Sequence, residues 1–420
     1  MSDSLGNNVV RSNKPLVRVW LIVVASLVSV WGSRMTFVGT GVWLFSTHES
    51  ASQLAWVAIV AIAPGLVAQP WVGRQMDCFS PRWVWLIGTA LALVCGVGFW
   101  WLLAHDRVTL PVLMAVAGLA SLASAVNQPF VMKLIKAAVP EARYLTVNSV
   151  RTVGFSVVEL AVPAMATWLL THYSLATIVA VDVASVMVCA LVVIACWSWL
   201  AALEHSTPKD SGKDAGQPSS TKRVSNGAIA YPLGNWIRRV VVIQGVVGMV
   251  MIGFMPLAIE RLSVVGYGWC VTLAGSAGVV GALLSARWPT RWLRTQGVDG
   301  LIVVLCGGLI VLALSKTIGL FVAMAMMIGG VYAAATSIVQ TGCLKATGET
   351  NAGGLMGRVF MWGGLASMVA AAITGALVDG VAARWQVEPG LASAWVMGTV
   401  GVLIITACGI RSAVSVAVPR

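Results

Sequence analysis

The chain has 420 residues, of which 58% are hydrophobic and only 10% charged, and its formal net charge is +12. Together with a mean hydropathy of +0.88, this composition excludes an ordinary soluble globular protein. Apolar runs of the roughly 20 residues that a spanning helix needs recur along the chain without period-2 alternation, so we predict an all-α membrane protein.

Twelve apolar runs can be marked along the chain as spanning helices. A polar tail precedes the first run, which at nearly 30 residues is longer than the roughly 7–15 apolar residues of a secretory signal peptide, so we expect it to be retained. The predicted spans are 16–45, 52–73, 83–104, 108–136, 147–171, 173–203, 237–262, 269–288, 298–315, 317–343, 353–382 and 391–413.

A stretch rich in Ser, Gly, Pro and Lys separates the sixth run from the seventh and is typical of a flexible linker. It leaves six spans on either side, the layout of membrane proteins built from two related halves. Leu134–Val150 and Cys343–Val359 occupy corresponding places in the two halves, and each has a Lys at the end of a span followed by an acid-containing turn. The predicted organisation is a tail at 1–15, a bundle at 16–203, a linker at 204–236, a second bundle at 237–413 and a tail at 414–420.

The positive charge is distributed unevenly between the two sides of the predicted bundle. With the N-terminus inside, 22 of the 27 Lys and Arg residues fall in cytoplasmic segments, four fall outside, and Arg34 lies within a helix. The positive-inside rule therefore explains the net charge without nucleic acid, and it predicts that both termini are cytoplasmic.

The residues of common catalytic and metal sites are present but not clustered. The eight Cys and four His residues are scattered singly, and no nucleotide-binding loop, zinc motif or nucleophile elbow occurs. We therefore expect no metal, no cofactor and no enzymatic activity, and we expect a monomer in the lipid bilayer.

The stretch WVGRQMDCFSPRWVW, Trp71–Trp85, lies between the second and third spans. It resembles the signature Gly-x-x-x-Asp-Arg-x-x-x-Arg of the major facilitator superfamily, with Gly73 and Asp77 in the Gly and Asp places and Arg82 in a following basic place. Cys78 stands where the family usually has Arg. The stretches VWGSRMTFVGTGVW, ESASQLAWVAIVAIAPGLVAQPWVG, NQPFVMKLIKAAVPEARYLTVNS and GRVFMWGGLASMVAAAITGALVDG resemble the macrolide-efflux and enterobactin-exporter-like branch of that superfamily.

The resemblance covers nearly the whole chain and implies twelve transmembrane helices in two pseudo-symmetric six-helix bundles. Members of this branch export siderophores, macrolides and other natural products across the bacterial inner membrane, usually by proton antiport. The resemblance therefore implies export of a small amphiphilic molecule in exchange for protons. The Gly-Pro motif that many antiporters have in span 5 is replaced by Val162-Pro163, so the direction rests on the branch. An importer on the same fold and a non-transporting receptor are the alternatives.

In this superfamily the Asp of the loop engages the start of span 11. Asp77 would then interact with the helix start at Gly353-Gly354, with Arg358 one turn on, and hold the cytoplasmic side closed. An anion at a helix N-terminus is stabilised by about 0.3–1 kcal/mol when exposed, and by roughly 2 kcal/mol when partly buried. A solvated turn residue is the alternative. The predicted gating residues are Gly73, Asp77, Arg82 and Arg358.

Three ionisable residues fall deep within predicted spans: Arg34 in the first, Glu159 in the fifth and Asp182 in the sixth. A charge at the bilayer centre costs about 2.5–3.5 kcal/mol on insertion scales, so such residues usually face a cavity and pair with one another. We predict a network of Arg34 with one or both acids, which exchanges protons as the protein changes state. A static ion pair is the alternative.

Spans 1, 4, 7 and 10 line the central cavity in this superfamily. Polar side chains on three of these spans are therefore candidates for contact with a substrate, although interhelical hydrogen bonding or packing is the alternative for each. The candidates are Asn127, Gln128, Gln244, Tyr332, Thr336 and Gln340.

Overall fold

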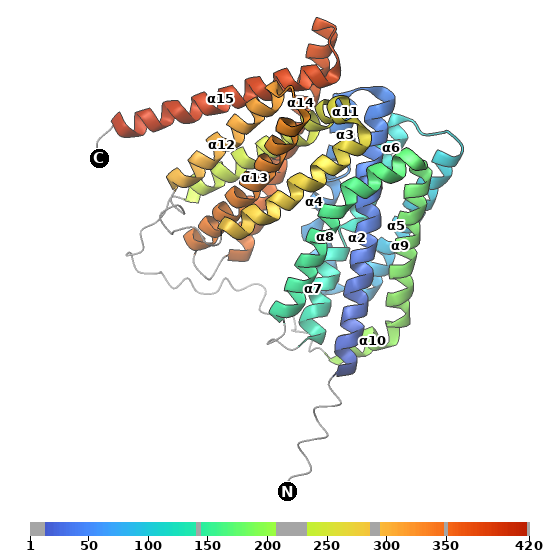
Figure 1. Cartoon of the computed structure of the whole chain (residues 1–420). Helices are drawn as coiled ribbons and strands as arrows, with labels where there is room; N and C mark the ends of the chain where they lie inside the picture. Colours follow the sequence, from blue (N-terminus) through green and yellow to red (C-terminus); the bar gives the residue numbers. More distant parts are fainter. Residues whose placement is uncertain (1–12, 140–143, 207–232, 286–294, 348–351, 418–420) are drawn as a thin grey trace, which may run out of the picture.

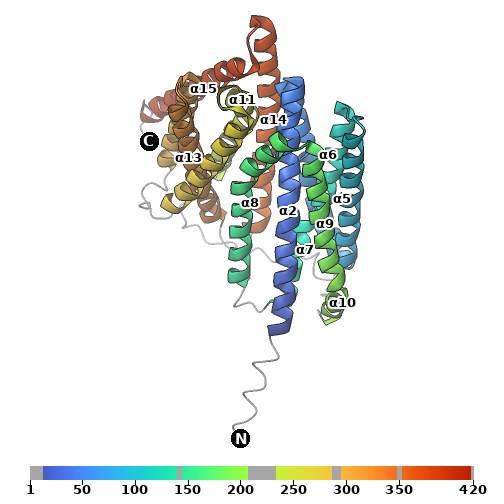
Figure 2. The same ribbon diagram turned by 45° about the vertical axis from the view of Figure 1, so that its right-hand side comes forward.

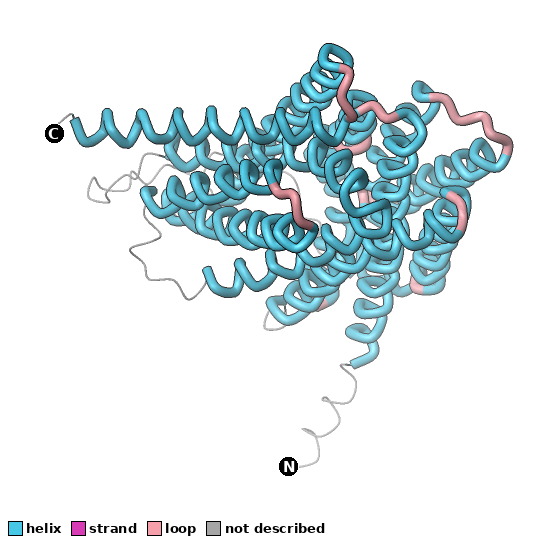
Figure 3. Tube along the Cα trace, turned by 45° about the horizontal axis from the view of Figure 1, so that its top comes forward, coloured by secondary structure: helices cyan, strands magenta, loops and turns pink. Residues whose placement is uncertain are grey.

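The computed structural model describes residues 13–139, 144–206, 233–285, 295–347 and 352–417 (Figure 1). Within these ranges the chain is helical and contains no strand, as the tube in Figure 3 shows. The all-α prediction is therefore confirmed, as expected for long apolar segments whose backbone polar groups must be satisfied within the helix itself. Most of the linker predicted at 204–236 lies outside the described residues, whereas its two ends, 204–206 and 233–236, are helical and belong to the adjoining helices.

Helices α2 to α10 form the amino-terminal group. They pack around two clusters of buried apolar side chains, one near Trp85 and Phe130 and one near Phe99 and Ile178. The group consists of α2 (Asn13–His48), α3 (Ala51–Val60), α4 (Ala63–Cys78), α5 (Pro81–Ala104), α6 (Leu110–Ser124), α7 (Asn127–Ala138), α8 (Tyr144–His172), α9 (Leu175–Ala195) and α10 (Trp197–Ser206).

Two prolines divide spans that the sequence predicted as continuous. Proline has no N–H, and its ring clashes with the carbonyl four residues earlier. Pro64 therefore leaves the carbonyl of Val60, the last residue of α3, without its helical donor, and the chain turns before α4. Pro129 likewise leaves the carbonyl of Ala125 without its helical donor, and Ala125 lies in the turn between α6 and α7. The second and fourth predicted spans are each made of two shorter helices for this reason.

Helices α11 to α15 form the carboxy-terminal group, which packs around a third cluster of buried side chains that includes Phe321 and Met397. Ser263, with φ 72° and ψ 171°, interrupts α11, and its Oγ accepts a hydrogen bond from the N–H of Gly266. The connector predicted at 263–268 is therefore much shorter than expected. The group consists of α11 (Leu233–Ser285), α12 (Thr295–Leu314), α13 (Ile318–Thr347), α14 (Ala352–Trp385) and α15 (Pro389–Ala417).

Ten segments of the described residues are long and apolar enough to cross a membrane. One of them, Trp236–Ser285, contains both the seventh and the eighth predicted spans on the two sides of Ser263. The fourth predicted span is not among the ten, because its apolar part, α6, has only 15 residues before the break. These two differences explain why ten segments correspond to twelve predicted spans.

The two groups touch each other mainly where α14 meets α3 and where α11 meets α8. We call the side of the molecule on which α2 begins the near side and the side on which α2 ends the far side. In Figure 2, α14 and α11 lie next to the end of α2, away from the chain's amino terminus. The third buried cluster crosses this boundary, because it also includes Val42, Phe45 and Leu54 of the amino-terminal group.

Candidate functional site

The first contact between the groups joins α14 to α3. A Cβ added at Gly375 would lie 2.8 Å from the carbonyl oxygen of Ala51 and 2.9 Å from Cβ of Ala55. These atoms belong to the backbone or lie directly on it, so the two helices are in close contact that only glycine permits. Ala51 is the first residue of α3, so this contact lies on the far side.

The second contact joins α11 to α8. A Cβ added at Gly268 would collide with Oγ1 of Thr167 and would lie 2.7 Å from the carbonyl oxygen of Pro163. Small residues let membrane helices approach closely in this way. The end of α2 completes the boundary, because Val42 is fully buried in the cluster of the carboxy-terminal group and Val38 packs against that cluster. We refer to the α3–α14, α8–α11 and α2–α11 contacts together as the far-side seam.

Two of the residues predicted to form a charged network are brought together beside this seam. Nε of Arg34 on α2 and Oε1 of Glu159 on α8 are 3.0 Å apart and form an ion pair. Each residue precedes a seam residue by four positions, Val38 for Arg34 and Pro163 for Glu159. Residues four apart lie on the same face of a helix, so we infer that Arg34 and Glu159 lie on the faces of α2 and α8 that approach the carboxy-terminal group, one turn nearer to the near side.

The ion pair is accessible although it lies within two apolar helices. The side chains of Arg34 and Glu159 are 49% and 57% exposed, so the carboxy-terminal group contacts the next turn of each helix but does not cover the pair itself. The pair therefore borders the space between the two groups at the inner end of the far-side seam.

The helix is weakened at Glu159 by the proline that follows it. Pro163 lies inside α8, and because it has no N–H, the carbonyl of Glu159 lacks its usual helical donor. Thr167 Oγ1 donates a hydrogen bond of 2.8 Å to the carbonyl of Pro163. The turn of α8 that contains Glu159 is thus less constrained than its neighbours, and it lies directly beside the contact with α11.

Asp182 belongs to a neighbouring contact rather than to the ion pair. Ser33 Oγ donates a hydrogen bond of 3.1 Å to Asp182 Oδ1. Gly32 permits this approach of α2 and α9, because a Cβ added there would lie 2.8 Å from Cα of Asp182. Among the described residues, Arg34 is paired with Glu159 and not with Asp182, so the structure brings one of the two predicted acids to the arginine.

The substrate-cavity candidates on α11 and α13 are partly brought together. Tyr332 donates a hydrogen bond of 3.1 Å from its hydroxyl to Oε1 of Gln244, which connects the two helices. Thr336 Oγ1 donates to the backbone carbonyl of Tyr332 at 2.9 Å, a bond within one helix. Asn127, at the start of α7, has a buried Oδ1 without a hydrogen-bond partner in the described part of the chain. The side chains of Gln128 and Gln340 lie outside the described part.

The predicted gating residues are only partly described. Gly73 and Asp77 belong to α4, close to its end at Cys78, and Arg358 belongs to α14. The side chains of Asp77 and Arg358 lie outside the described part, so their predicted interaction remains a prediction. Arg82 belongs to the first turn of α5, where its Nε donates to Ser80 Oγ at 3.2 Å and its guanidinium lies 5.2 Å from the ring centroid of Trp197.

Two charged contacts were not predicted from the sequence. Arg239 on α11, 6% exposed, donates from Nε and Nη2 to the two carboxylate oxygens of Asp299 on α12 at 2.8 and 2.7 Å. Asp379 on α14 joins the start of α3 across the far-side seam. Each acid lies near the end of a predicted span, where a charge needs no explanation. The sequence does contain one signal for Asp379. This acid lies close to the end of its span, and α3 in the other half begins without an acid in its first turn.

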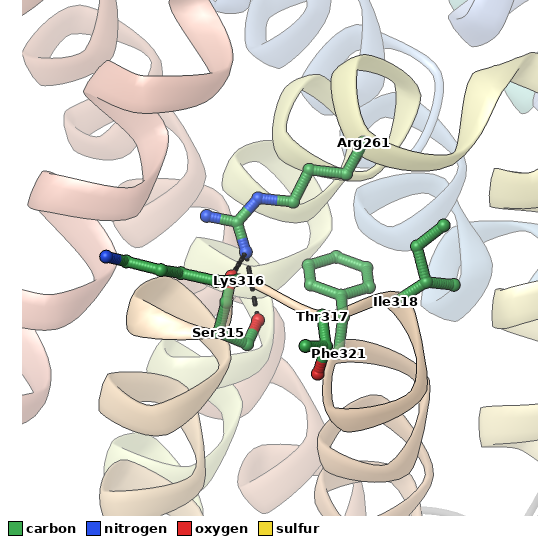
Figure 4. A pocket seen from close by; sticks show the side chains of 6 residues that line it. All are labelled: Arg261, Ser315, Lys316, Thr317, Ile318 and Phe321. Carbon is green, nitrogen blue, oxygen red and sulfur yellow. Dashed lines mark hydrogen bonds between the residues drawn. The ribbon is translucent and has the colours of Figure 1, made fainter.

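An open pocket of about 280 Å³ near Arg261 is explained by helix capping (Figure 4). The guanidinium of Arg261 donates to the backbone carbonyls of Leu312 at 3.2 Å and of Ala313 at 3.0 Å, and to Ser315 Oγ at 2.9 Å. The last carbonyls of α12 have no donor within their own helix. The guanidinium of Arg261 therefore supplies hydrogen-bond donors to the last carbonyls of α12, and its Cζ lies 5.4 Å from the ring centroid of Phe321.

Apolar helices of membrane-spanning length in two groups, with an accessible ion pair between α2 and α8 of the amino-terminal group, define a multi-pass membrane protein built from two halves. Residues 22–371 match the family model described as Major Facilitator Superfamily. The chain therefore belongs to this superfamily of transporters, and its fold is the major facilitator fold.

A relative from Sinorhizobium fredii, named uncharacterized MFS-type transporter y4rN, is 25% identical to the chain over 160 residues. The match covers 37% of this chain and 38% of that relative. It agrees with the family but spans less than half of either protein.

Solved structures of similar fold extend over nearly the whole chain. A mutant of the nucleoside transporter NupG has a TM-score of 0.68 at 13% identity, covering 94% of this chain and 99% of its own. A bacterial homologue of the iron transporter ferroportin in an inward-facing state has a TM-score of 0.67 at 14% identity, covering 93% and 99%. A bacterial homologue of the human lysosomal transporter Spinster, inward-facing and unoccupied, has a TM-score of 0.65 at 12% identity, covering 94% and 91%.

Proposed function

We propose that this chain is a secondary active transporter that exports a small amphiphilic molecule, such as a siderophore or an antibiotic, across the bacterial inner membrane in exchange for protons. The observation that supports this proposal most is the Arg34–Glu159 ion pair at the inner end of the far-side seam. Transport by alternating access requires that a bound ion or substrate changes the contacts between the two halves. This pair is one helical turn from those contacts on both α2 and α8.

The coupling step follows from the charges of the pair. The opposite charges of Arg34 and Glu159 attract each other and hold α2 and α8 together at this point. In the proposal, separation of Arg34 from Glu159 accompanies the uptake of one proton by the protein, and the return of the arginine accompanies its release. The missing helical hydrogen bond at Pro163 allows α8 to deform at this turn.

The direction and the cargo rest on the resemblance to the macrolide-efflux and enterobactin-exporter-like branch. Two of the solved proteins of the same fold are named for different cargo, a nucleoside in one case and iron in the other, so the fold does not select one. The polar candidates at the Gln244–Tyr332 contact, together with Asn127, would supply hydrogen bonds for an amphiphilic molecule. With cytoplasmic termini, the near side would be the cytoplasmic side.

The predicted gate on the near side is part of the proposal. Asp77 at the end of α4 would interact with the start of α14 near Arg358 when the near side is closed, since an anion is favoured at a helix N-terminus. A closed far-side seam and a closed near-side gate would then alternate.

Comparison of cells and medium by untargeted mass spectrometry tests the function and its direction. The compared strains lack the protein or produce the wild type, Glu159→Gln or the control Asp106→Asn, which removes an exposed acid from the loop after α5. We expect a compound that is retained in cells lacking the protein and in Glu159→Gln cells but released by wild-type and Asp106→Asn cells. A compound left unused in the medium of the deletion strain would establish import instead, and identical profiles would contradict transport of a cellular product.

A further inference from the structure

Asp379 crosses from one half of the protein to the other on the far side. Its carboxylate accepts a hydrogen bond of 2.7 Å from Ser50 Oγ, one of 2.8 Å from the N–H of Ala51 and one of 3.0 Å from the N–H of Ser52. Asp379 belongs to α14 of the carboxy-terminal group, whereas its three partners are the N-cap and first residues of α3 in the amino-terminal group.

The start of α3 depends on this carboxylate. The first four N–H groups of a helix have no acceptor within the helix and must find one elsewhere. In α3 the N–H of Gln53 donates to Ser50 Oγ at 3.3 Å, and the N–H of Leu54 donates to the carbonyl of Ser50 at 3.3 Å. The N–H groups of Ala51 and Ser52 donate to Asp379. The first turn of α3 contains no acid, so the negative charge that a helix start favours comes from the other half.

The packing one turn earlier on α14 fixes this geometry. Gly375 precedes Asp379 by four residues and is pressed against Ala51 and Ala55, so α14 is seated on the same turn of α3 that its carboxylate caps. Ala51 is fully buried. Separation of the two halves on the far side therefore has to break the three hydrogen bonds and expose the N–H groups of Ala51 and Ser52, whose acceptors in the structure are the carboxylate oxygens of Asp379.

We propose that Asp379 is the latch that holds the far-side seam closed, and that its release accompanies the opening of this side. The second span (α3 and α4) and α14 are antiparallel, so each begins where the other ends. Asp379 near the end of α14 caps the start of α3, and Asp77 near the end of α4 would cap the start of α14 on the near side. The same pair of helices thus has one acid for each closed state. The latch rests on alternating access from the proposed function but not on export or on protons.

Distances across the far side test the latch directly. Spin labels at Asp106, in the loop after α5, and at Lys316, in the loop after α12, report the separation of the two halves by double electron–electron resonance in a cysteine-free background. Asp379→Ala should raise the ratio of open to closed far-side distances at least tenfold. The control Glu388→Ala, which removes an exposed acid just beyond α14, should leave the ratio unchanged.

A double variant separates a latch from a simple helix cap. Ser50→Asp combined with Asp379→Ala gives α3 an acidic N-cap of its own, which restores its start without a bond between the halves. The latch predicts that this variant folds, as judged by a single symmetric gel-filtration peak, and remains as open as Asp379→Ala. Wild-type distances in either variant would overturn the proposal. If Asp379→Ala alone does not fold, the double variant decides the matter.

The latch and the proposed export can fail separately. If the wild type exports its compound but the variants keep wild-type distances, the latch is refuted and export is not. If the variants are open but the wild type exports nothing, export is refuted and the latch is not.

Discussion

Substitution of Gly375 by alanine should open the far-side seam. The new Cβ would lie 2.8 Å from the carbonyl oxygen of Ala51, 2.9 Å from Cβ of Ala55 and 2.9 Å from Cα of Ser52. Ordinary contacts begin near 3.4 Å, and none of these three atoms is the end of a flexible side chain. Helices α3 and α14 would have to move apart by about half an ångström or more along this contact, which would also stretch the hydrogen bonds of Asp379.

The expected size of the effect follows from the packing of the contact. Overpacking of a well-packed site typically costs about 1–3 kcal/mol. The strain exists only while the seam is closed, because separation of the halves removes the methyl group from α3. A difference of about 1–3 kcal/mol between two states corresponds to a shift of roughly 5- to 150-fold in their ratio. The alanine variant should therefore raise the open-to-closed ratio on the far side by a factor in that range.

The helix itself provides a matched control for this experiment. Gly380 lies five residues further along α14, and nothing lies within 4 Å of a Cβ added there. Gly380→Ala gains the same helix propensity without the collision, so it should retain wild-type distances between labels at Asp106 and Lys316. Equal distance distributions for Gly375→Ala and Gly380→Ala would refute the reasoning, because the close contact would then not restrain the two halves.

Three further predictions concern other parts of the chain. Asp77→Asn should reduce transport at normal membrane insertion, and unchanged transport would eliminate the near-side gate. Asp299→Ala removes the carboxylate to which Nε and Nη2 of the buried Arg239 donate. Since Asp299 itself is 46% exposed, we expect a loss of roughly 1–3 kcal/mol, seen as a lower unfolding temperature in detergent. An unchanged temperature would contradict a stabilising pair. Pro163→Ala restores an N–H opposite the carbonyl of Glu159, so the unfolding temperature should rise and transport should slow; faster transport would contradict a role for deformation of α8.

The fold could be predicted from the sequence because length and hydropathy determine which segments cross a membrane. The twelve predicted spans correspond to the observed helices, but their internal breaks were not predicted. Pro64 and Pro129 lie within apolar runs, where hydropathy gives no sign of a turn, and their effect depends on the carbonyl four residues earlier. The short connection at Ser263 depends on a single residue with a positive φ, which the pattern of apolar residues does not reveal.

The candidate site was predicted in part, for a related reason. Arg34 and Glu159 stand out in the sequence because a charge is rare in the middle of an apolar helix. Their pairing could be expected, but the partner of Asp182 could not, since it is a serine hydroxyl and serines are too common in the spans to single one out. Asp379 was missed because its partners are two backbone N–H groups and a serine hydroxyl in the other half. Backbone partners have no side chain to mark them, so the sequence offers only an acid near the end of one span and a helix start without an acid in the other half. The contact of α14 with α3 is needed to join the two.

The most direct test of the central claim measures proton-driven transport of the compound that mass spectrometry identifies. Inverted membrane vesicles from cells with the wild type, Glu159→Gln or Asp106→Asn are given an acidic interior, and uptake of the compound is followed with and without nigericin, which abolishes the pH gradient. We predict that the wild type and Asp106→Asn accumulate the compound only while the gradient exists, and that Glu159→Gln stays at the nigericin level. Accumulation by Glu159→Gln equal to the wild type would contradict coupling through the Arg34–Glu159 pair.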